Sequence, residues 1–306
     1  VGLPAGHRLG RGPRRAGRGL HRLVVVARRR VVHGALRGGG AGQEDGGQDH
    51  RSVAKRVRHD ARVAGAARTR RVRLGAIEAT LASYLERLDL PREACVPPGP
   101  APLARLHARH LERVPFENLD IWWGVPIVLD ERAIVAKVLR GRGGFCYELN
   151  AAFAWLLRAL GYEVTLLEAR VASDGGGFGR PFDHLALRVD MDTPWLADVG
   201  FGECFVEPLP LDSDAVSAQR GTEYRLRTGR SGRVLEQRRP GEAWDPQYEL
   251  RPEPRELADF EPGCTYHQTS PESKFTQRPL CTRLDGGVRG TLHRDRLVRG
   301  EESTPV

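Results

Sequence analysis

Large aromatic residues are missing from the first 73 residues, which contain no Phe, Tyr or Trp. The same stretch holds 18 Arg and one Lys against four acidic residues, a net charge of +15, so the rest of the chain carries −6 of the overall +9. A segment with so few large apolar side chains cannot bury a core of its own. We therefore expect residues 1–73 to be a basic extension that is disordered, or the product of a translation start placed too far upstream.

The extension lacks other features that would give it a function. Arginine-rich segments bind nucleic acid phosphates, but here no aromatic side chains are interleaved on which bases would stack. The apolar run 23–27 is too short for a signal sequence or a membrane span. Ser52 is its only serine, where a transit peptide would hold several. We therefore expect no membrane anchor, and we keep nucleic acid binding only as a lesser alternative.

Cysteine is also scarce, and the five that occur are Cys95, Cys146, Cys204, Cys264 and Cys281. An odd count without a signal sequence is typical of a reducing cytoplasm. No Cys-x-x-Cys or His-x-x-x-His pair suggests a zinc site. The glycine-rich stretch 174–179 has no phosphate-binding fingerprint and indicates a hairpin loop instead. We predict a cytoplasmic protein without a bound metal.

One of these cysteines follows two glycines and opens an apolar helix pattern. From Cys146 onward the apolar residues recur at helical spacing as Leu149, Phe153, Leu156, Leu157 and Leu160, and Gly161 ends the pattern. A helix N-terminus favours a thiolate and lowers the cysteine pKa from about 8.5. Its free N–H groups also suit a developing oxyanion. By position alone, a small buried structural cysteine is the more common explanation of Cys146.

A His–Asp pair is predicted downstream on a hairpin. Residues 181–189 and 195–199 alternate like strands, and turn-forming residues separate them. If the turn centres near Met191, His184 and Asp198 lie opposite each other, and a slip by one residue makes them diagonal neighbours. Singly, they fit a buried histidine and a strand-end cap. Together with the preceding cysteine they indicate Cys-His-Asp nucleophilic catalysis.

The order of elements indicates an α+β fold. Helices are predicted at 77–88, at 102–114, and at 127–139, where the helix begins near Asp130. Strands follow from 162–172 onward and continue through short segments that include Trp244 and Tyr248, both expected to be packed. Helices before the nucleophile and strands after it argue against alternating βαβ units.

Several motifs in the same order resemble the arylamine N-acetyltransferases, over roughly residue 74 to the end. They are residues 114–120 (VPFENLD), 142–150 (RGGFCYELN), 183–189 (DHLALRV), 195–202 (WLADVGFG) and 273–278 (SKFTQR). The resemblance implies a papain-like cysteine-transferase architecture with a helical bundle at 74–161, an antiparallel β-barrel domain at 162–262 and a partial α/β lid at 263–306. We expect that lid to be truncated, because the family continues into a C-terminal helix.

The resemblance also implies the site and the reaction. It assigns catalytic roles to Cys146, His184 and Asp198, substrate binding to Phe116, Phe201 and Gly202, and structural support to an ion pair of Glu117 with Arg142 beneath the cysteine. Asp183 departs from the family, in which we expect threonine, and adds a second carboxylate beside His184. No tightly bound cofactor is implied. Acetyl-CoA would be the co-substrate, and its acetyl group would pass through the cysteine to an arylamine, arylhydrazine or arylhydroxylamine.

Two further readings stay open besides nucleic acid binding. The amide synthase branch of the same family would use the same triad to release a polyketide chain as a macrolactam, with an acyl-carrier protein as partner.

Cys204 lies six residues beyond Asp198, but without a helix start we expect it to be structural. A papain-like or transglutaminase-like peptidase would also use Cys, His and Asp, although the family motifs argue against it.

Overall fold

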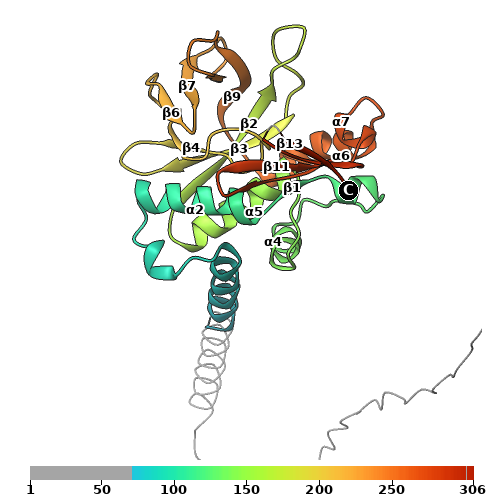
Figure 1. The fold of residues 1–306 in the computed structure, drawn as a ribbon. Helices are drawn as coiled ribbons and strands as arrows, with labels where there is room; N and C mark the ends of the chain where they lie inside the picture. The colour runs from blue at the N-terminus through green and yellow to red at the C-terminus, as the bar shows by residue number, and fades with distance from the viewer. Residues whose placement is uncertain (1–70, 301) are drawn as a thin grey trace, which may run out of the picture. The chain divides into compact units, whose positions relative to one another are not determined.

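Helices come first and strands follow in the part of the chain that the structure, a computed structural model, describes: residues 71–300 and 302–306 (Figure 1). Our expectation for the basic extension therefore lies outside the described residues, except that 71–73 are helical and not disordered. The helix 71–88 buries Leu81, Tyr84 and Leu88 as predicted. Ile77, which we placed on the same face, is 38% exposed because the core begins one turn later.

The remaining helices before residue 163 are η1 (Arg92–Ala94), α2 (Pro100–Arg113), α3 (Leu119–Trp122), α4 (Glu131–Leu139) and α5 (Cys146–Ala159). The ones that begin near residues 100, 131 and 146 were predicted, and the two short ones, η1 and α3, were not. Helix α2 begins two residues earlier than predicted, since proline is well suited to the first helical position. Helix α4 begins where expected, because the Asp130 side chain accepts a hydrogen bond from the Ala133 N–H at 2.8 Å.

An eight-stranded antiparallel sheet forms the second part. Its strands are β2 (Glu163–Val171), β3 (His184–Asp190), β4 (Trp195–Ala197), β5 (Leu209–Pro210), β6 (Ser217–Gln219), β7 (Thr222–Thr228), β8 (Arg233–Arg238) and β9 (Asp245–Arg255). They are ordered β5-β4-β3-β2-β9-β8-β7-β6. The two edges meet where the Gln219 side chain accepts hydrogen bonds from the N–H groups of Val206 and Glu207, each at 2.8 Å. The sheet is thus a nearly closed barrel, and the α+β prediction is confirmed.

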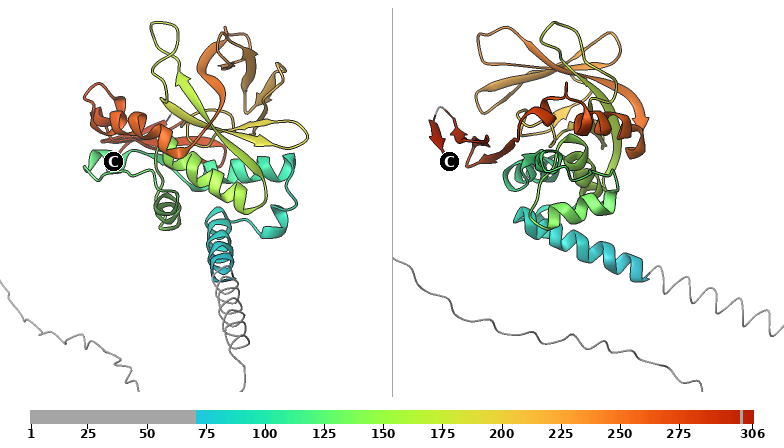
Figure 2. Two further views of the ribbon diagram at one scale, coloured as in Figure 1. Left: turned by 180° about the vertical axis from the view of Figure 1, so that it is seen from behind. Right: turned by 90° about the vertical axis from the view of Figure 1, so that its right-hand side faces the viewer.

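The β3–β4 hairpin turns one residue later than predicted, which moves each cross-strand partner by two residues. Leu187 pairs with Ala197 and Val189 with Trp195, so the turn centres on Asp192 and not on Met191. Asp198 therefore lies diagonally from His184, which is the alternative that a slip by one residue produces. Helix α5 packs against β2 and β3 (Figure 2). Cys146, the first residue of α5, thereby lies close to the loop that follows this hairpin.

The last part of the chain returns to the segment after α2. It comprises η2 (Leu257–Phe260), α6 (Glu261–Thr269), α7 (Lys274–Gln277), β10 (Cys281–Asp285), β11 (Val288–Leu292), β12 (Arg296–Arg299) and β13 (Glu302–Pro305). Strand β10 pairs with β1 (Phe116–Glu117), which gives a second sheet in the order β1-β10-β11-β12-β13. The C-terminal polar run thus contributes a strand. The domain limits that we predicted stay a prediction.

Candidate active site

The two glycines before Cys146 allow a close approach of the chain. A Cβ on Gly143 would overlap the Pro115 carbonyl, and a Cβ on Gly144 would lie 2.6 Å from a Glu148 carboxylate oxygen. The backbone of Gly144 also accepts a hydrogen bond from the Glu117 N–H at 2.8 Å. The R-G-G motif therefore fixes the entry to α5, where Cys146 is the first helical residue and only 4% exposed.

His184 and Asp198 form a buried pair. His184 Nε2 lies 2.7 Å from Asp198 Oδ2, and both side chains are almost fully buried. The other oxygen, Asp198 Oδ1, accepts hydrogen bonds from Asn150 Nδ2 and from the Gly200 N–H, each at 2.9 Å. Burial alone would raise the pKa of Asp198, but the charge and hydrogen bond of His184 and the other donors lower it overall. The carboxylate is thus held in its ionised form.

The loop after Asp198 rests directly on the first turn of α5. A Cβ on Gly200 would lie 2.7 Å from Asn150 Nδ2 and 2.9 Å from the Cys146 Cα and carbonyl oxygen. Only glycine permits this approach. It brings the cysteine, the histidine and the aspartate together, although they come from three elements.

Cys146 and His184 line one cleft of about 510 Å³. Phe116 and Phe201 line it too, whereas Gly202 does not, and substrate binding by these three residues stays a prediction. The ring of Phe201 meets the His184 ring edge to face, with 5.2 Å between the centroids. Helices α6 and α7 also line the cleft, through Tyr266, His267, Lys274 and Phe275.

The thiol differs from the expectation for a helix start. Burial raises the pKa of Cys146 well above its ordinary value, and the nearby Cys264, Asp198 and Asp183 raise it further. The hydrogen bond from the Tyr147 N–H acts in the opposite direction but is weaker. The expectation of a lowered pKa is therefore wrong for the thiol by itself, because it left out desolvation.

Asp183, the second carboxylate, does not contact His184 but faces a different histidine. Its Oδ1 lies 3.1 Å from His267 Nε2, and His267 Nδ1 lies 3.2 Å from Ser273 Oγ. Its backbone carbonyl accepts a hydrogen bond from the Tyr147 hydroxyl. Cys204 packs in the barrel core and does not line the cleft. Among the described residues no cluster of His, Cys, Asp and Glu could hold a metal ion.

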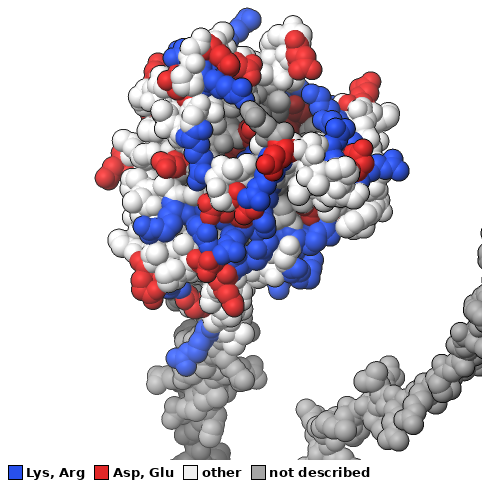
Figure 3. All heavy atoms as spheres, viewed as in Figure 1, with Lys and Arg blue, Asp and Glu red and all other residues white. Residues whose placement is uncertain are grey.

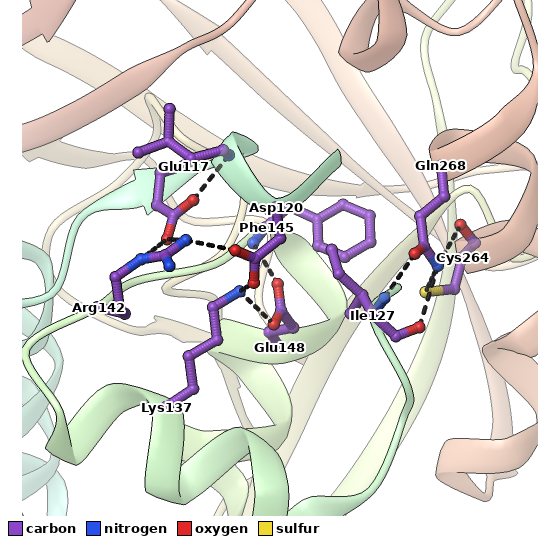
Figure 4. A network of polar contacts seen from close by, with 10 residues as sticks. Glu117, Asp120, Ile127, Lys137, Arg142, Phe145, Glu148, Cys264 and Gln268 are labelled. Atoms are coloured by element: carbon purple, nitrogen blue, oxygen red, sulfur yellow. Dashed lines mark hydrogen bonds and ion pairs between the residues drawn. The ribbon is translucent and has the colours of Figure 1, made fainter. Parts of the chain in front are cut away.

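The predicted contact between Glu117 and Arg142 is part of a larger charged network (Figure 4). Arg142 Nη2 lies 2.8 Å from Glu117 Oε1 and 2.7 Å from Asp120 Oδ1. Lys137 Nζ lies 2.6 Å from Asp120 Oδ2 and 2.7 Å from Glu148 Oε1. Glu148 also accepts a hydrogen bond from the Phe145 N–H at 3.3 Å, next to Cys146.

Five residues near this site were not found from the sequence: Asp120, Lys137, Glu148, His107 and Asn150. Lys137 gave one signal, because it lies on the α4 face that buries Ile134 and Val138. Asn150 gave another, since it lies four residues after Cys146 and so on the same helix face. His107 gave none, because it is 91 residues from the Asp198 N–H that it contacts.

On the face that Figure 3 shows, basic and acidic side chains of the described residues are interspersed. In the part of the chain that the structure describes, no helix has the length and apolar character needed to span a membrane.

Comparison with known proteins agrees with this geometry. A family model described as N-acetyltransferase matches residues 101–304. The arylamine N-acetyltransferase of Mycolicibacterium smegmatis is 36% identical over 206 residues, which cover 64% of this chain and 73% of that protein. Proansamycin X synthase of Amycolatopsis mediterranei is 35% identical over 184 residues, which cover 58% of this chain and 70% of that protein.

A solved structure extends the likeness to the fold. The arylamine N-acetyltransferase of Mycobacterium marinum in complex with CoA superimposes with a TM-score of 0.67 at 30% identity, over 74% of this chain and 86% of that one. Fold and sequence together thus define an acyl-transferring enzyme. The chain belongs to the arylamine N-acetyltransferase family.

Proposed function

We propose that this protein transfers the acetyl group of acetyl-CoA, through a thioester on Cys146, to an arylamine, arylhydrazine or arylhydroxylamine. The observation that carries the proposal is the placement of Cys146, at the start of α5, in the same cleft as a His184 whose Nε2 is bound to buried Asp198. This arrangement supplies a nucleophile, a base and a group that orients the base. Cytoplasmic localisation stays a prediction from the cysteine count.

The first half-reaction begins with a proton transfer. Because Nε2 of His184 is bound to Asp198, Nδ1 is the ring nitrogen left to accept the thiol proton, and no described residue hydrogen-bonds to it. Since burial raises the pKa of Cys146, a solitary thiolate is unfavourable. The thiolate therefore forms together with the His184 imidazolium, which the ionised Asp198 stabilises.

Acetyl transfer then proceeds through two tetrahedral intermediates. The thiolate attacks the thioester carbonyl, the bond to the CoA sulfur breaks, and that sulfur takes the proton from the imidazolium. The amine next attacks the acetyl-cysteine, gives a proton to His184 and releases Cys146. The N–H groups in the first turn of α5 form the positive end of the helix dipole and suit the oxyanion.

The cleft offers different surfaces to the two substrates. Phe116, Phe201 and Phe275 provide apolar walls for an aromatic acceptor. Lys274 and Arg278 line the cleft on and just after α7 and suit the phosphates of the donor. We propose no tightly bound cofactor, because the donor itself brings the reacting group.

Mass spectrometry of the enzyme without acceptor tests the proposal. The full chain is incubated with acetyl-CoA and no amine, and then digested. We expect one added acetyl group, about 42 Da, on the peptide with Cys146, and its loss when an arylamine is added. Cys146→Ala should show no adduct, and Cys264→Ala, which removes another buried thiol near the cleft, should retain it. A folded wild-type protein without adduct would contradict acetyl-CoA as the donor.

The amide synthase alternative rests on the likeness to proansamycin X synthase. The same triad would then accept a long acyl chain from a carrier protein and pass it to an amine within that chain. This alternative is favoured if Cys146 is acylated by an acyl-carrier thioester and not by acetyl-CoA. Labelling by acetyl-CoA with turnover of simple arylamines would exclude it as the main activity.

A further inference from the structure

Two buried side chains hold Asp198 from opposite sides, and the mechanism above does not use either of them. His107 on α2 contacts the Asp198 backbone, and Asn150 on α5 contacts its carboxylate. We propose that His107 and Asn150 are positioning residues that fix Asp198, and through it the orientation of the His184 ring toward Cys146. This inference rests on the proposed function, because it concerns the same triad.

His107 is held in one tautomer by its two neighbours. Its Nδ1 lies 2.7 Å from the Val206 carbonyl oxygen, which can only accept, so Nδ1 carries the hydrogen. Its Nε2 therefore has a lone pair and accepts the Asp198 N–H at 3.0 Å. The ring is fully buried and stacks on Phe205 with 5.5 Å between the centroids. Burial lowers the pKa of His107 to about 4, so the ring stays neutral and able to accept at neutral pH.

Asn150 connects all three elements of the site. It lies one helical turn after Cys146, and its Nδ2 donates to the Leu185 carbonyl, next to His184, at 2.6 Å and to Asp198 Oδ1 at 2.9 Å. Its Oδ1 accepts the Val199 N–H at 3.0 Å. Both donor hydrogens and one acceptor site of this fully buried amide are thus used between the nucleophile helix, the histidine strand and the aspartate loop.

The consequence concerns which carboxylate oxygen meets the histidine. Because Asn150 and the Gly200 N–H occupy Oδ1 of Asp198, Oδ2 remains for His184 Nε2. A fixed Nε2 contact leaves Nδ1 on the cleft side of the ring. With His107 holding the backbone and Asn150 the side chain, Asp198 cannot rotate to present its other oxygen without breaking hydrogen bonds in a buried site.

Helix α2 offers a matched control for His107. His110 is also fully buried and lies one turn further on, but its Nε2 bonds to the Tyr84 hydroxyl at 3.0 Å and not to the triad. Both histidines contact the Phe153 ring edge to face. His107→Phe and His110→Phe each replace a buried imidazole by a phenyl ring, so a general loss of stability should affect both variants.

The experiment measures Cys146 acetylation by acetyl-CoA in the full chain across pH 5 to 9, by quenched mass spectrometry. For His107→Phe we expect a rate at least about tenfold lower, a dependence on acetyl-CoA concentration unchanged within about twofold, and a narrower pH range of fast acetylation. His110→Phe should stay within about threefold of wild type with an unchanged pH profile. His107→Gln, whose side-chain oxygen can accept the Asp198 N–H, should recover part of the rate.

Asn150→Asp is the second variant, in case His107→Phe does not fold. It keeps the side-chain size and the acceptor for the Val199 N–H, but it removes both donated bonds, so we expect a loss at least as large. If folded His107→Phe and Asn150→Asp acetylate as fast as His110→Phe with the same pH profile, the proposal is overturned.

Alkylation of Cys146 by iodoacetamide separates this proposal from the proposed function. If acetyl-CoA labels no variant, wild type included, the acetyl transfer reaction fails, but the alkylation rate against pH still reports the thiolate–imidazolium pair. The positioning role is upheld if His107→Phe and Asn150→Asp change the dependence of the alkylation rate on pH and His110→Phe leaves it as in the wild type. Identical profiles in all four proteins would refute it.

Discussion

Removal of Lys137 is the perturbation with the clearest energetic consequence. Lys137 is 8% exposed, and it is the cation closest to Glu148, which is 3% exposed (Figure 4). Asp120, its other partner, still has Arg142. Lys137→Met would therefore leave one buried carboxylate without a counter-ion, and a charge of that kind is strongly unfavourable.

The size of the effect follows from protonation. Burial already raises the pKa of Glu148, although Lys137 lowers it. Without Lys137, Glu148 would become neutral in the folded protein. Holding a carboxyl of ordinary pKa 4.5 protonated costs about 1.4 kcal/mol per pH unit above that value. The variant should therefore lose about 3 kcal/mol at pH 7 and less than about 1 kcal/mol at pH 5.

The sign of the pH dependence can be worked out directly. In the variant, the folded-state pKa of Glu148 lies above its unfolded value, so the unfolded chain releases a proton that the folded chain keeps. The free energy of unfolding of Lys137→Met is therefore highest below pH 4.5 and falls as pH rises toward and through the folded-state pKa of Glu148. Urea unfolding of wild type and Lys137→Met at pH 5, 6 and 7 measures this difference.

A charge-matched double variant supplies the control. Lys137→Met with Glu148→Gln removes both charges and keeps an oxygen for the Phe145 N–H. We expect it to regain most of the stability at pH 7, since replacing a buried ion pair by neutral groups is often close to neutral. The reasoning is refuted if the single variant loses as much at pH 5 as at pH 7, or if the double variant is no more stable than the single one.

Three further predictions follow from the site. Gly200→Ala should abolish most acetylation of Cys146, since the added Cβ would overlap the first turn of α5. It should lower the free energy of unfolding in urea by about 1–3 kcal/mol. Normal activity would contradict this prediction. Burial lowers the pKa of His110 to about 3, so this residue alone should reduce the free energy of unfolding by about 1.4 kcal/mol per pH unit as pH drops below 6.5. Buried His107 adds a similar slope, so His110→Phe should remove about half of the combined histidine slope in thermal melts, and an unchanged slope would contradict the prediction. Arg278 lines both the cleft and a neighbouring pocket that also contains Arg294 and Arg296. Arg278→Ala should therefore raise KM for acetyl-CoA several-fold but leave KM for acetyl-N-acetylcysteamine, a donor without phosphates, unchanged. Equal effects on both donors would contradict this prediction.

The sequence by itself determined the local parts of the site. The helical period after Cys146, the two glycines before it and the alternation around His184 depend only on neighbours within a few residues. The predicted turn centre, Met191, lies one residue from the observed centre at Asp192, because turn formers restrict the register to a few choices. The helix-then-strand order, which needs no long-range information, gave the α+β class.

Only the tertiary structure decided the parts that join distant segments. The pairing of Phe116 with Thr282 and the hydrogen bond from Asp198 to His107 have no local sequence pattern. Charged residues such as Lys137 look like surface residues until burial and partners are known. Burial also reversed the expected direction of the Cys146 pKa, because desolvation depends on everything that packs around the thiol and not on the helix it begins.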